Sequence, residues 1–417
     1  MNLILLGLLL SYNPFYIFFL MHEGALGGSR IRFGMISVFT FALIVRIFTS
    51  SGLGKDFRLK INLISFALLT LGVGFVLSIV GFLVRGNNLV YAGIDFFPVY
   101  EMFLGFGAVY VGRDKNHEVH ITEKQISVFK YYYFSMIITG LFSYILLGYF
   151  LKADFGAIRA YVKGETVNRL MDFMGPSMVP FLFVRFFFNR QGMAERIGTA
   201  LAAAMLLLSY YRSLYIAVFL AFLSMVFVEL GRQKRGSMIP VLQRALLLAF
   251  IVAMIFFVVD FFNSGFGKTI VDRVSSIFEA DSTVEDSKVT RIMQIALIPR
   301  MIDTFPIGHG LGAFIQNDPV GVMFNYFLQF GLLMGVPFLF VFIWLWLALF
   351  RKLIQRYNSE PDEIVRGVYG VLMSGVFTFF FVLNLFPYMT YFPFMLFFGM
   401  ALAFVQHKVV VIRPKEA

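Results

Sequence analysis

The stretch INLISFALLTLGVGFVLSIVGFLV, residues 61–84, decides the fold class of this chain. It carries no charged side chain, and it is long enough for a bilayer-spanning helix, which needs about 20 apolar residues. Similar stretches recur along the chain, which is 59% hydrophobic and only 14% charged. A soluble domain has about 25% charged residues, so this chain has too little polar surface to cover a water-soluble body. We therefore predict an all-α, polytopic integral membrane protein.

Hydropathy predicts about twelve transmembrane helices in a single transmembrane domain over residues 1–417. The predicted spans are 2–21, 33–51, 61–84, 96–112, 126–151, 172–189, 197–211, 213–230, 241–262, 322–350, 367–385 and 390–406. With a cytoplasmic N-terminus, the positive-inside rule holds, because the loops rich in Lys and Arg then face inward. These inner segments are 52–60, 113–125, 190–196, 231–240, 351–366 and the tail from His407.

Two outer segments are longer than the other outer loops. The smaller covers residues 152–171, and the larger covers residues 263–321. Long loops on a rigid scaffold are common places for binding and catalysis, so we expect the active site on the outer face. In the large loop, residues 286–305 show helical spacing of apolar residues interrupted at Pro299, which predicts two short helices at the membrane surface. The glycine-rich PIGHGLGAF, residues 306–314, then predicts a turn whose backbone closely approaches another surface.

Several classes of function are disfavoured by composition. The net charge of +11 is explained by inner loops that hold the topology, so nucleic acid is not an expected partner. The chain has no cysteine, which excludes thiolate metal sites and a cysteine nucleophile. No group of His, Asp and Glu has the spacing of metal ligands, and no paired carboxylates resemble those of a glycosidase. We expect neither a metal nor a cofactor.

Arginines on the outer face are the main candidate site residues. A guanidinium grips phosphate oxygens with two parallel hydrogen bonds, so it suits a diphosphate group. The alternative is that each arginine extends its charge to the interface and only fixes topology, although outer arginines run against the positive-inside trend. Arg46 and Glu101 are predicted within spans, where they either form a structural ion pair or face a cavity. The outer candidates are Arg159, Arg169, Arg212, Arg291 and Arg300.

His309 is the only candidate general base, because it stands in the glycine-rich turn of the large outer loop. A neutral imidazole accepts a proton from an attacking sugar hydroxyl. The alternative reading is that its ring bonds to the loop backbone and fixes the turn.

The chain resembles the O-antigen polymerase and ligase superfamily in topology over nearly its whole length, and its motif-level similarity is concentrated in residues 205–230 and 285–337. LLLSYYRSLYIAVFLAF, residues 206–222, resembles its helix, Ser-Arg turn and helix, with Arg212 at the position of a key arginine and Tyr211 beside it. Residues 287–314 resemble its arginine, amphipathic helix, proline, glycine turn and phenylalanine, with Arg291 at the second key arginine. FGLLMGVPF, residues 330–338, resembles the Gly-Leu-Leu-Gly stretch that follows. Ligases have a His, often before Asn, where this chain has Phe324 and Asn325, so the resemblance favours a Wzy-type polymerase.

The resemblance implies a membrane-embedded, inverting and metal-independent glycosyltransferase with GT-C-like architecture. Its donor and acceptor would be polyprenyl-diphosphate-linked glycans, with a chain-length regulator protein as an optional partner. Arg212 and Arg291 would bind the diphosphate, and Asp318 would stand near the acceptor. The implied location is a bacterial inner membrane with a periplasmic site. Two rival readings are a ligase that transfers the glycan to a lipid or protein, and a transporter or flippase of a lipid-linked sugar. Transporters often show related halves, and we find no internal repeat.

Overall fold

The structure is a computed structural model of the chain. The residues that it describes are 62–111, 118–122, 159–162, 165–168, 212–232, 296–304, 306–315, 318–319, 325–383 and 394–412, with Phe41, Val45, Met193 and Ile197. Most of them are helical. The helices are α4 (Leu63–Arg85), α5 (Leu89–Val111), α9 (Arg212–Arg232), α13 (Arg300–Asp303), α14 (Tyr326–Met334), α15 (Val336–Ser359), α16 (Glu363–Leu383) and α17 (Phe394–Gln406).

Within these ranges, four helices are long and apolar enough to cross a bilayer: α4, residues 91–110 of α5, α15 and α16. The prediction of a helical membrane protein is therefore supported. α4 begins and ends within two residues of its predicted bounds, because Asn62 caps its start and Gly86 ends it in the left-handed conformation. The predicted spans 2–21, 33–51, 126–151, 172–189, 197–211 and 241–262 lie largely or wholly outside the described residues.

The predicted span 322–350 is wrong as a single helix. The chain forms the nine-residue α14, breaks at Gly335, and then forms the 24-residue α15, which is the membrane-length helix. Gly335 has a φ of 103°, a conformation that side chains with a Cβ rarely adopt. A proline in the first turn of α15 also suits a helix start. The first N–H groups of a helix have no partner within the helix, so proline loses no hydrogen bond there.

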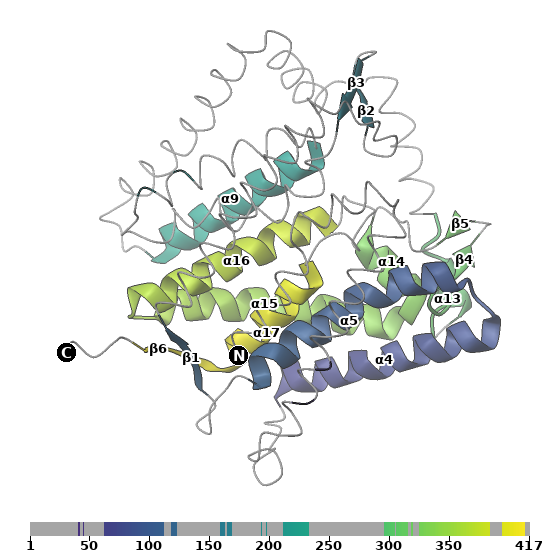
Figure 1. The fold of residues 1–417 in the computed structure, drawn as a ribbon, viewed down its shortest axis with the longest axis horizontal. Coiled ribbons are helices and arrows are strands. Elements are labelled where there is room, and N and C mark those ends of the chain that lie inside the picture. Colours follow the sequence, from purple (N-terminus) through teal and green to yellow (C-terminus); the bar gives the residue numbers. More distant parts are fainter. Residues whose placement is uncertain are drawn as a thin grey trace.

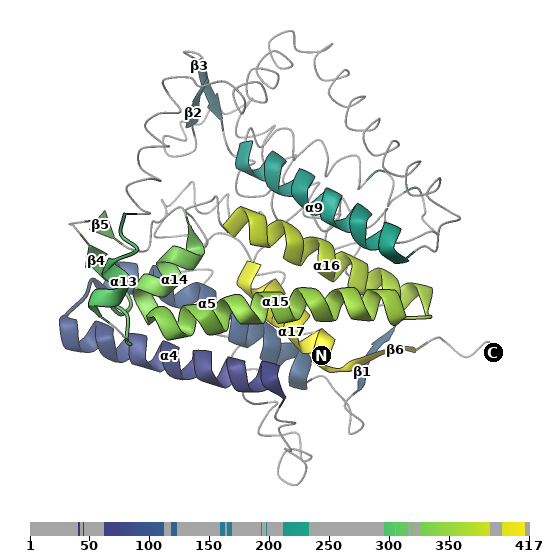
Figure 2. The same ribbon diagram turned by 180° about the vertical axis from the view of Figure 1, so that it is seen from behind.

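The long helices lie side by side and form a bundle, with α16 between α9 and α15 (Figures 1 and 2). The core between α14, α15, α16 and α17 is aromatic. Trp346 and Phe342 are almost completely buried, and the rings of Phe330 and Phe342 stack with centroids 4.3 Å apart. α5 and α17 pack with their backbones in contact, since a Cβ on Gly105 or Gly399 would overlap a backbone carbonyl of the other helix.

α4 has one buried face and one exposed apolar face. The exposed residues are large and apolar and recur every three or four positions up to Leu83, with Val84 next to it, which is the pattern of a helix in lipid. They are Leu63, Phe66, Leu69, Val73, Val76, Val80, Leu83 and Val84.

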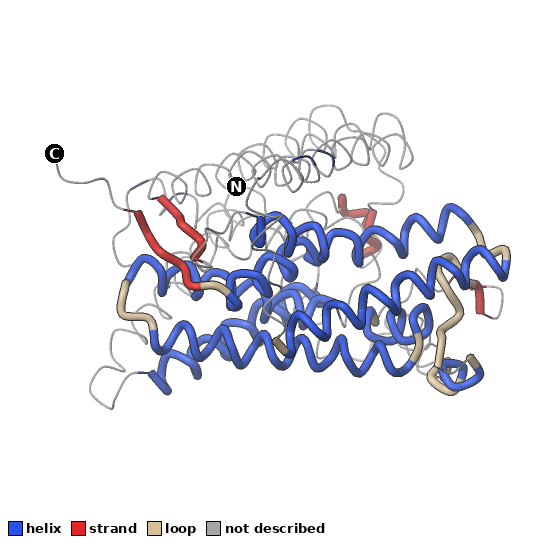
Figure 3. The backbone as a smooth tube through the Cα atoms, turned by 90° about the horizontal axis from the view of Figure 1, so that it is seen from below, coloured by secondary structure: helices blue, strands red, loops and turns tan. Residues whose placement is uncertain are grey.

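In the part of the chain that the structure describes, three short two-stranded sheets accompany the helices, and they were not part of the all-α prediction (Figure 3). β1 (Glu118–Thr122) pairs in parallel with β6 (Lys408–Ile412). β2 (Arg159–Val162) and β3 (Glu165–Asn168) form an antiparallel pair in the smaller predicted loop, and β4 (Phe314–Ile315) and β5 (Asp318–Pro319) form another in the larger one. β1 and β6 belong to the 113–125 loop and the C-terminal tail, two segments that the charge pattern assigns to the same side of the membrane.

The bundle has two distinct ends. At the β1–β6 end, the Nδ2 of Asn62 donates to the Oε1 of Gln406 at 3.0 Å, which joins the start of α4 to the end of α17. At the opposite end, the turn between α4 and α5 contacts residues 309–312. We call residues 306–313 the glycine turn and this end of the bundle the glycine-turn end.

Candidate functional site

The glycine turn is bound to the bundle through its backbone. The N–H groups of His309 and Gly310 donate to the carbonyls of Leu332 and Leu333, at 2.7 and 3.0 Å. These carbonyls belong to the last turn of α14, where helix carbonyls have no partner within the helix, so the glycine turn caps α14. The N–H of Leu311 donates to the carbonyl of Ser78 on α4 at 3.1 Å. Two helices that are distant in sequence thus fix one short loop.

Glycines are required where the turn passes between helices. Gly310 and Gly312 have φ values of 82° and 67°. A Cβ on Gly310 would lie 2.8 Å from the backbone carbon of Gly81 on α4, and a Cβ on Gly312 would overlap the carbonyl of Asn88. The predicted close approach of this turn to another surface is confirmed, and the surface is formed by α4 and the start of α5.

The turn between α4 and α5 holds the same loop from the other side. The Nδ2 of Asn87 donates to two carbonyls of the glycine turn, that of His309 at 3.1 Å and that of Leu311 at 2.9 Å. The N–H of Asn88 donates to the carbonyl of Gly312 at 3.2 Å. Three carbonyls of the glycine turn, those of residues 309, 311 and 312, are therefore bonded as well as four of its N–H groups, which holds the loop against the bundle.

Asp95 of α5 is the buried acceptor that completes this arrangement. Its Oδ2 accepts the N–H of Gly312 at 2.8 Å, and its Oδ1 accepts the Nε2 of Gln329 on α14 at 2.9 Å. Asp95 and Gln329 are each only 3% exposed. One carboxylate thus joins α5, α14 and the glycine turn. A buried carboxylate without partners is costly, and here each oxygen has a donor.

Asp95 was missed in the sequence because α5 was predicted to start at residue 96, whereas it starts at Leu89. A helix that starts at residue 89 places Asp95 inside a span. An acid inside a span would have been noted as a candidate functional residue.

His309 is half-buried, and its ring contacts the segment that precedes the turn. Its Nε2 lies 3.1 Å from the carbonyl oxygen of Arg300. Because a carbonyl only accepts, this bond requires a hydrogen on Nε2, and the neutral ring then has its lone pair on Nδ1. Burial lowers the pKa of His309 below its ordinary value, and the charges of Arg85 and Arg300 lower it further, against a raising effect of the bond to Arg300. His309 is therefore mainly neutral near pH 7.

The contact of the His309 ring fits the alternative reading, in which His309 fixes the turn, and it leaves Nδ1 for the role of a base. The neighbouring charges come from Arg85, the last residue of α4, and from Arg300 and Asp303 of α13. Arg300 and Asp303 form an ion pair at 3.2 Å, with both side chains 53% exposed, so the pair contributes little stability. Arg85 was an outer-loop arginine in the charge pattern, and its position beside His309 is not evident from sequence.

The other predicted site residues are described only in part or not at all. Arg212 is the first residue of α9, at the glycine-turn end, since Arg232 at the other end of α9 contacts the end of α15. α9 packs on α16, whereas the glycine turn contacts α4, α5 and α14. Arg159 opens β2, and Asp318 pairs with Ile315. Three further candidates lie outside the described residues: Tyr211, Arg169 and Arg291. Arg46 lies outside them too, so its predicted pairing with Glu101 is not described, and Glu101 is buried in α5.

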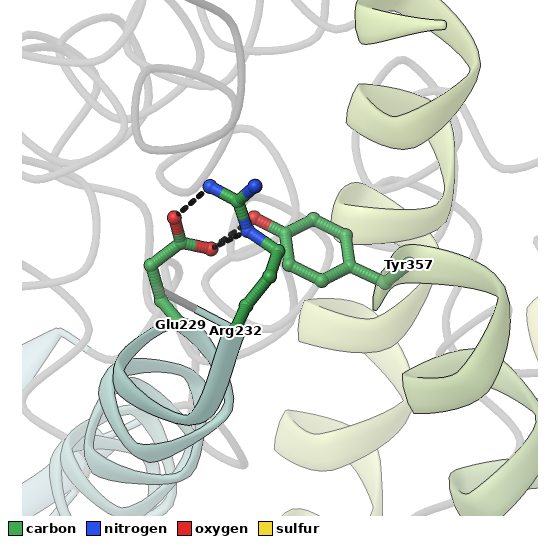
Figure 4. A network of polar contacts seen from close by, with 3 residues as sticks. All are labelled: Glu229, Arg232 and Tyr357. Atoms are coloured by element: carbon green, nitrogen blue, oxygen red, sulfur yellow. Dashed lines mark hydrogen bonds and ion pairs between the residues drawn. The ribbon is translucent and has the colours of Figure 1, made fainter. Parts of the chain in front are cut away.

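A second polar cluster joins α9 to α15 at the β1–β6 end (Figure 4). Glu229 is 2% exposed. Its Oε2 accepts the hydroxyl of Tyr357 at 2.6 Å and the Nε of Arg232 at 3.1 Å, while its Oε1 accepts a second Arg232 nitrogen. The Arg232 guanidinium also lies 5.9 Å from the centroid of the Tyr357 ring. This cluster fixes the position of α9 along α15, and its hydrogen bonds satisfy the buried carboxylate.

Within the ranges that the structure describes, no group of three or more His, Asp or Glu side chains could hold a metal ion. A search of protein-family models found no match to this chain, and a search of curated proteins also found none.

Proposed function

We propose that this protein polymerises polyprenyl-diphosphate-linked oligosaccharide repeat units into a surface polysaccharide. The observation that carries the proposal is the order of features in the sequence. Arg212 precedes a long apolar helix, and Arg291 precedes an amphipathic segment, a proline and a glycine turn with a histidine. The resemblance to O-antigen polymerases rests on this order. The fixed conformation of the glycine turn supports the proposal, because catalytic groups act best on a preorganised scaffold.

In the proposed reaction, a hydroxyl at the non-reducing end of the acceptor attacks the anomeric carbon of the donor glycan. The new glycosidic bond forms with inversion while the bond from that carbon to the diphosphate oxygen breaks. Arg212 and Arg291 bind the diphosphate and stabilise the charge that develops on it. The hydroxyl proton passes to the Nδ1 of His309 or to the departing diphosphate. Arg159, Arg169, Arg300, Tyr211 and Asp318 are the proposed contacts to the two substrates.

The architecture and location belong to the same proposal. About twelve spans would enclose the site in a membrane-embedded glycosyltransferase of GT-C-like form. The cationic inner loops would face the cytoplasm of a bacterial inner membrane, and the glycine-turn end would face the periplasm. A polymerase is favoured over a ligase by Phe324, which stands before Asn325 at the position where ligases have a histidine. Asn325 has another role here, since its side chain accepts the N–H of Leu328 and caps α14.

The test is turnover of a synthetic polyprenyl-diphosphate oligosaccharide by purified protein, without added metal or nucleotide. We expect a ladder of products from the wild type and none from Arg291→Ala. Arg351→Ala is the matched control, because Arg351 is an exposed arginine near the β1–β6 end of α15, and it should leave the ladder intact. An unchanged ladder from Arg291→Ala would refute the role of that arginine. Single transfer to a lipid acceptor without a ladder would instead identify a ligase, and lipid-linked sugar crossing vesicles unchanged would identify a flippase.

A further inference from the structure

The glycine turn contacts α4 before the helix ends and does not lie beyond its last residue. α4 has 23 residues, and at 1.5 Å per residue it is about 34 Å long, slightly more than a hydrocarbon core of about 30 Å. Leu311 bonds to Ser78, which is seven residues before Arg85, the last residue of α4. That spacing corresponds to about 10 Å along the helix axis. The turn also reaches Asp95, about two helical turns into α5, so contacts to two helices give the same depth.

The central residues of the turn, 309–312, have the internal backbone bonding that hydrocarbon requires of irregular structure. In lipid, every backbone polar group needs a partner within the protein, and non-helical segments occur at membrane depth only where protein buries them. The four consecutive N–H groups from His309 to Gly312 all donate to protein acceptors, on α14, α4 and α5. Gly308 and the residues from Gly310 to Ala313 are buried. These four N–H groups therefore need no water as a partner, which a position at membrane depth requires.

The exposed side chains in and beside the turn indicate contact with lipid. Four large apolar residues are exposed in and beside the turn: Ile298 (48%), Ile302 (69%), Ile307 (38%) and Phe314 (43%). They stand at the same end of the bundle as Leu83 and Val84, the last exposed apolar residues of α4. Two arginines, Arg85 and Arg300, flank this surface. Apolar side chains bordered by basic ones are typical of segments at the boundary between acyl chains and headgroups.

We propose that the glycine turn is a re-entrant element of the membrane. Its exposed side chain Ile307 and the neighbouring Ile298, Ile302 and Phe314 lie among lipid acyl chains near the headgroups, and Arg85 faces lipid phosphates. The chain therefore returns into the bilayer at residues 306–313. This inference stands apart from the proposed chemistry and would hold for a polymerase, a ligase or a transporter.

The experiment uses the absence of cysteine from the chain, which makes any introduced cysteine unique. Ile302→Cys and Ile307→Cys are labelled with a nitroxide in the full-length protein in phospholipid nanodiscs. Collisions of the label with oxygen, which concentrates in lipid, are compared with collisions with a water-soluble nickel chelate. Two reference positions bracket the scale. Val76→Cys reports lipid, since Val76 is 57% exposed in the middle of α4, and Ser359→Cys reports water at the exposed end of α15.

We expect the ratio of oxygen to nickel collisions at both test positions to be several-fold higher than at Ser359 and within about threefold of that at Val76. Ratios equal to that at Ser359 would overturn the proposal and place the turn in water. If the Ile307 variant does not fold, Phe314→Cys supplies the second position, and the same comparison decides the question.

Discussion

The most informative perturbation is the replacement of Asp95, because this one carboxylate joins the glycine turn to two helices. Asp95→Ala leaves two buried donors without a partner, the N–H of Gly312 and the Nε2 of Gln329. An unsatisfied buried donor costs roughly 1–3 kcal/mol, and Asp95→Ala leaves two. We therefore expect the free energy of local opening of the glycine turn to fall by about 2–6 kcal/mol. Asp95→Asn keeps an acceptor for Gly312, and rotation of the Gln329 amide restores the second bond, so its cost should stay below about 1.5 kcal/mol.

Hydrogen exchange of a peptide that covers the glycine turn measures this change directly, because local opening controls exchange of its amides. At about 1.4 kcal/mol per tenfold change, Asp95→Ala should speed exchange by at least about 30-fold, and Asp95→Asn by less than about tenfold. Thr378→Val is the matched control. Thr378 is buried, but its hydroxyl bonds only to the carbonyl of Ser374 in its own helix, so exchange of the turn should not change. Wild-type exchange rates in Asp95→Ala would refute the claim that this carboxylate holds the turn.

Three further predictions concern packing, the second polar cluster and pH. Gly399→Ala should lower the thermal unfolding midpoint, since its Cβ would overlap backbone of α5 and overpacking costs about 1–3 kcal/mol; Gly93→Ala, with open space around it, should not. Tyr357→Phe removes a 2.6 Å bond to Glu229 and should cost about 1.5–3 kcal/mol in denaturant unfolding, whereas a loss near zero would mean that the bond is dispensable. The pKa of His309 is lower in the folded state than its ordinary 6.5, so the unfolded chain binds the proton first as pH falls. Its contribution to stability is complete above pH 6.5 and declines as pH falls below it; midpoints measured from pH 5 to 7.5 should therefore fall less steeply in His309→Gln than in the wild type.

The sequence predicted the helices best where local signals mark both ends. α4 has an asparagine cap at one end and a glycine in the left-handed conformation at the other, and its bounds were predicted to within two residues. The start of α5 was placed seven residues late, because Asn87, Asn88 and Asp95 made the region look like a loop. The side chain of Asn88 bonds locally, since its Oδ1 accepts the N–H of Tyr91. Asn87 and Asp95 are tolerated there because the glycine turn and Gln329 supply their partners. Such partners come from residues more than 200 positions away, which no local pattern reveals.

The candidate site shows the same division between local and distant information. The three glycines and His309 were evident in the sequence, and their close approach to another surface followed from residue type alone. The identity of that surface did not, since Ser78 and Asp95 lie in helices whose order in the bundle is set by tertiary packing. The pairing of β1 with β6 was equally hidden, although the charge pattern had already placed both segments on one side of the membrane.

The break at Gly335 links the fold to the proposed position of the glycine turn in the membrane. Had residues 322–350 formed one straight helix, the carbonyls of Leu332 and Leu333 would have been used within it. The break ends α14 early and leaves these carbonyls to accept the N–H groups of His309 and Gly310. A Cβ on Gly335 would overlap the carbonyl of Pro306, so the break and the turn also pack directly on one another. The interrupted helix and the turn therefore satisfy each other's backbone groups, which is the condition for irregular backbone to exist at membrane depth.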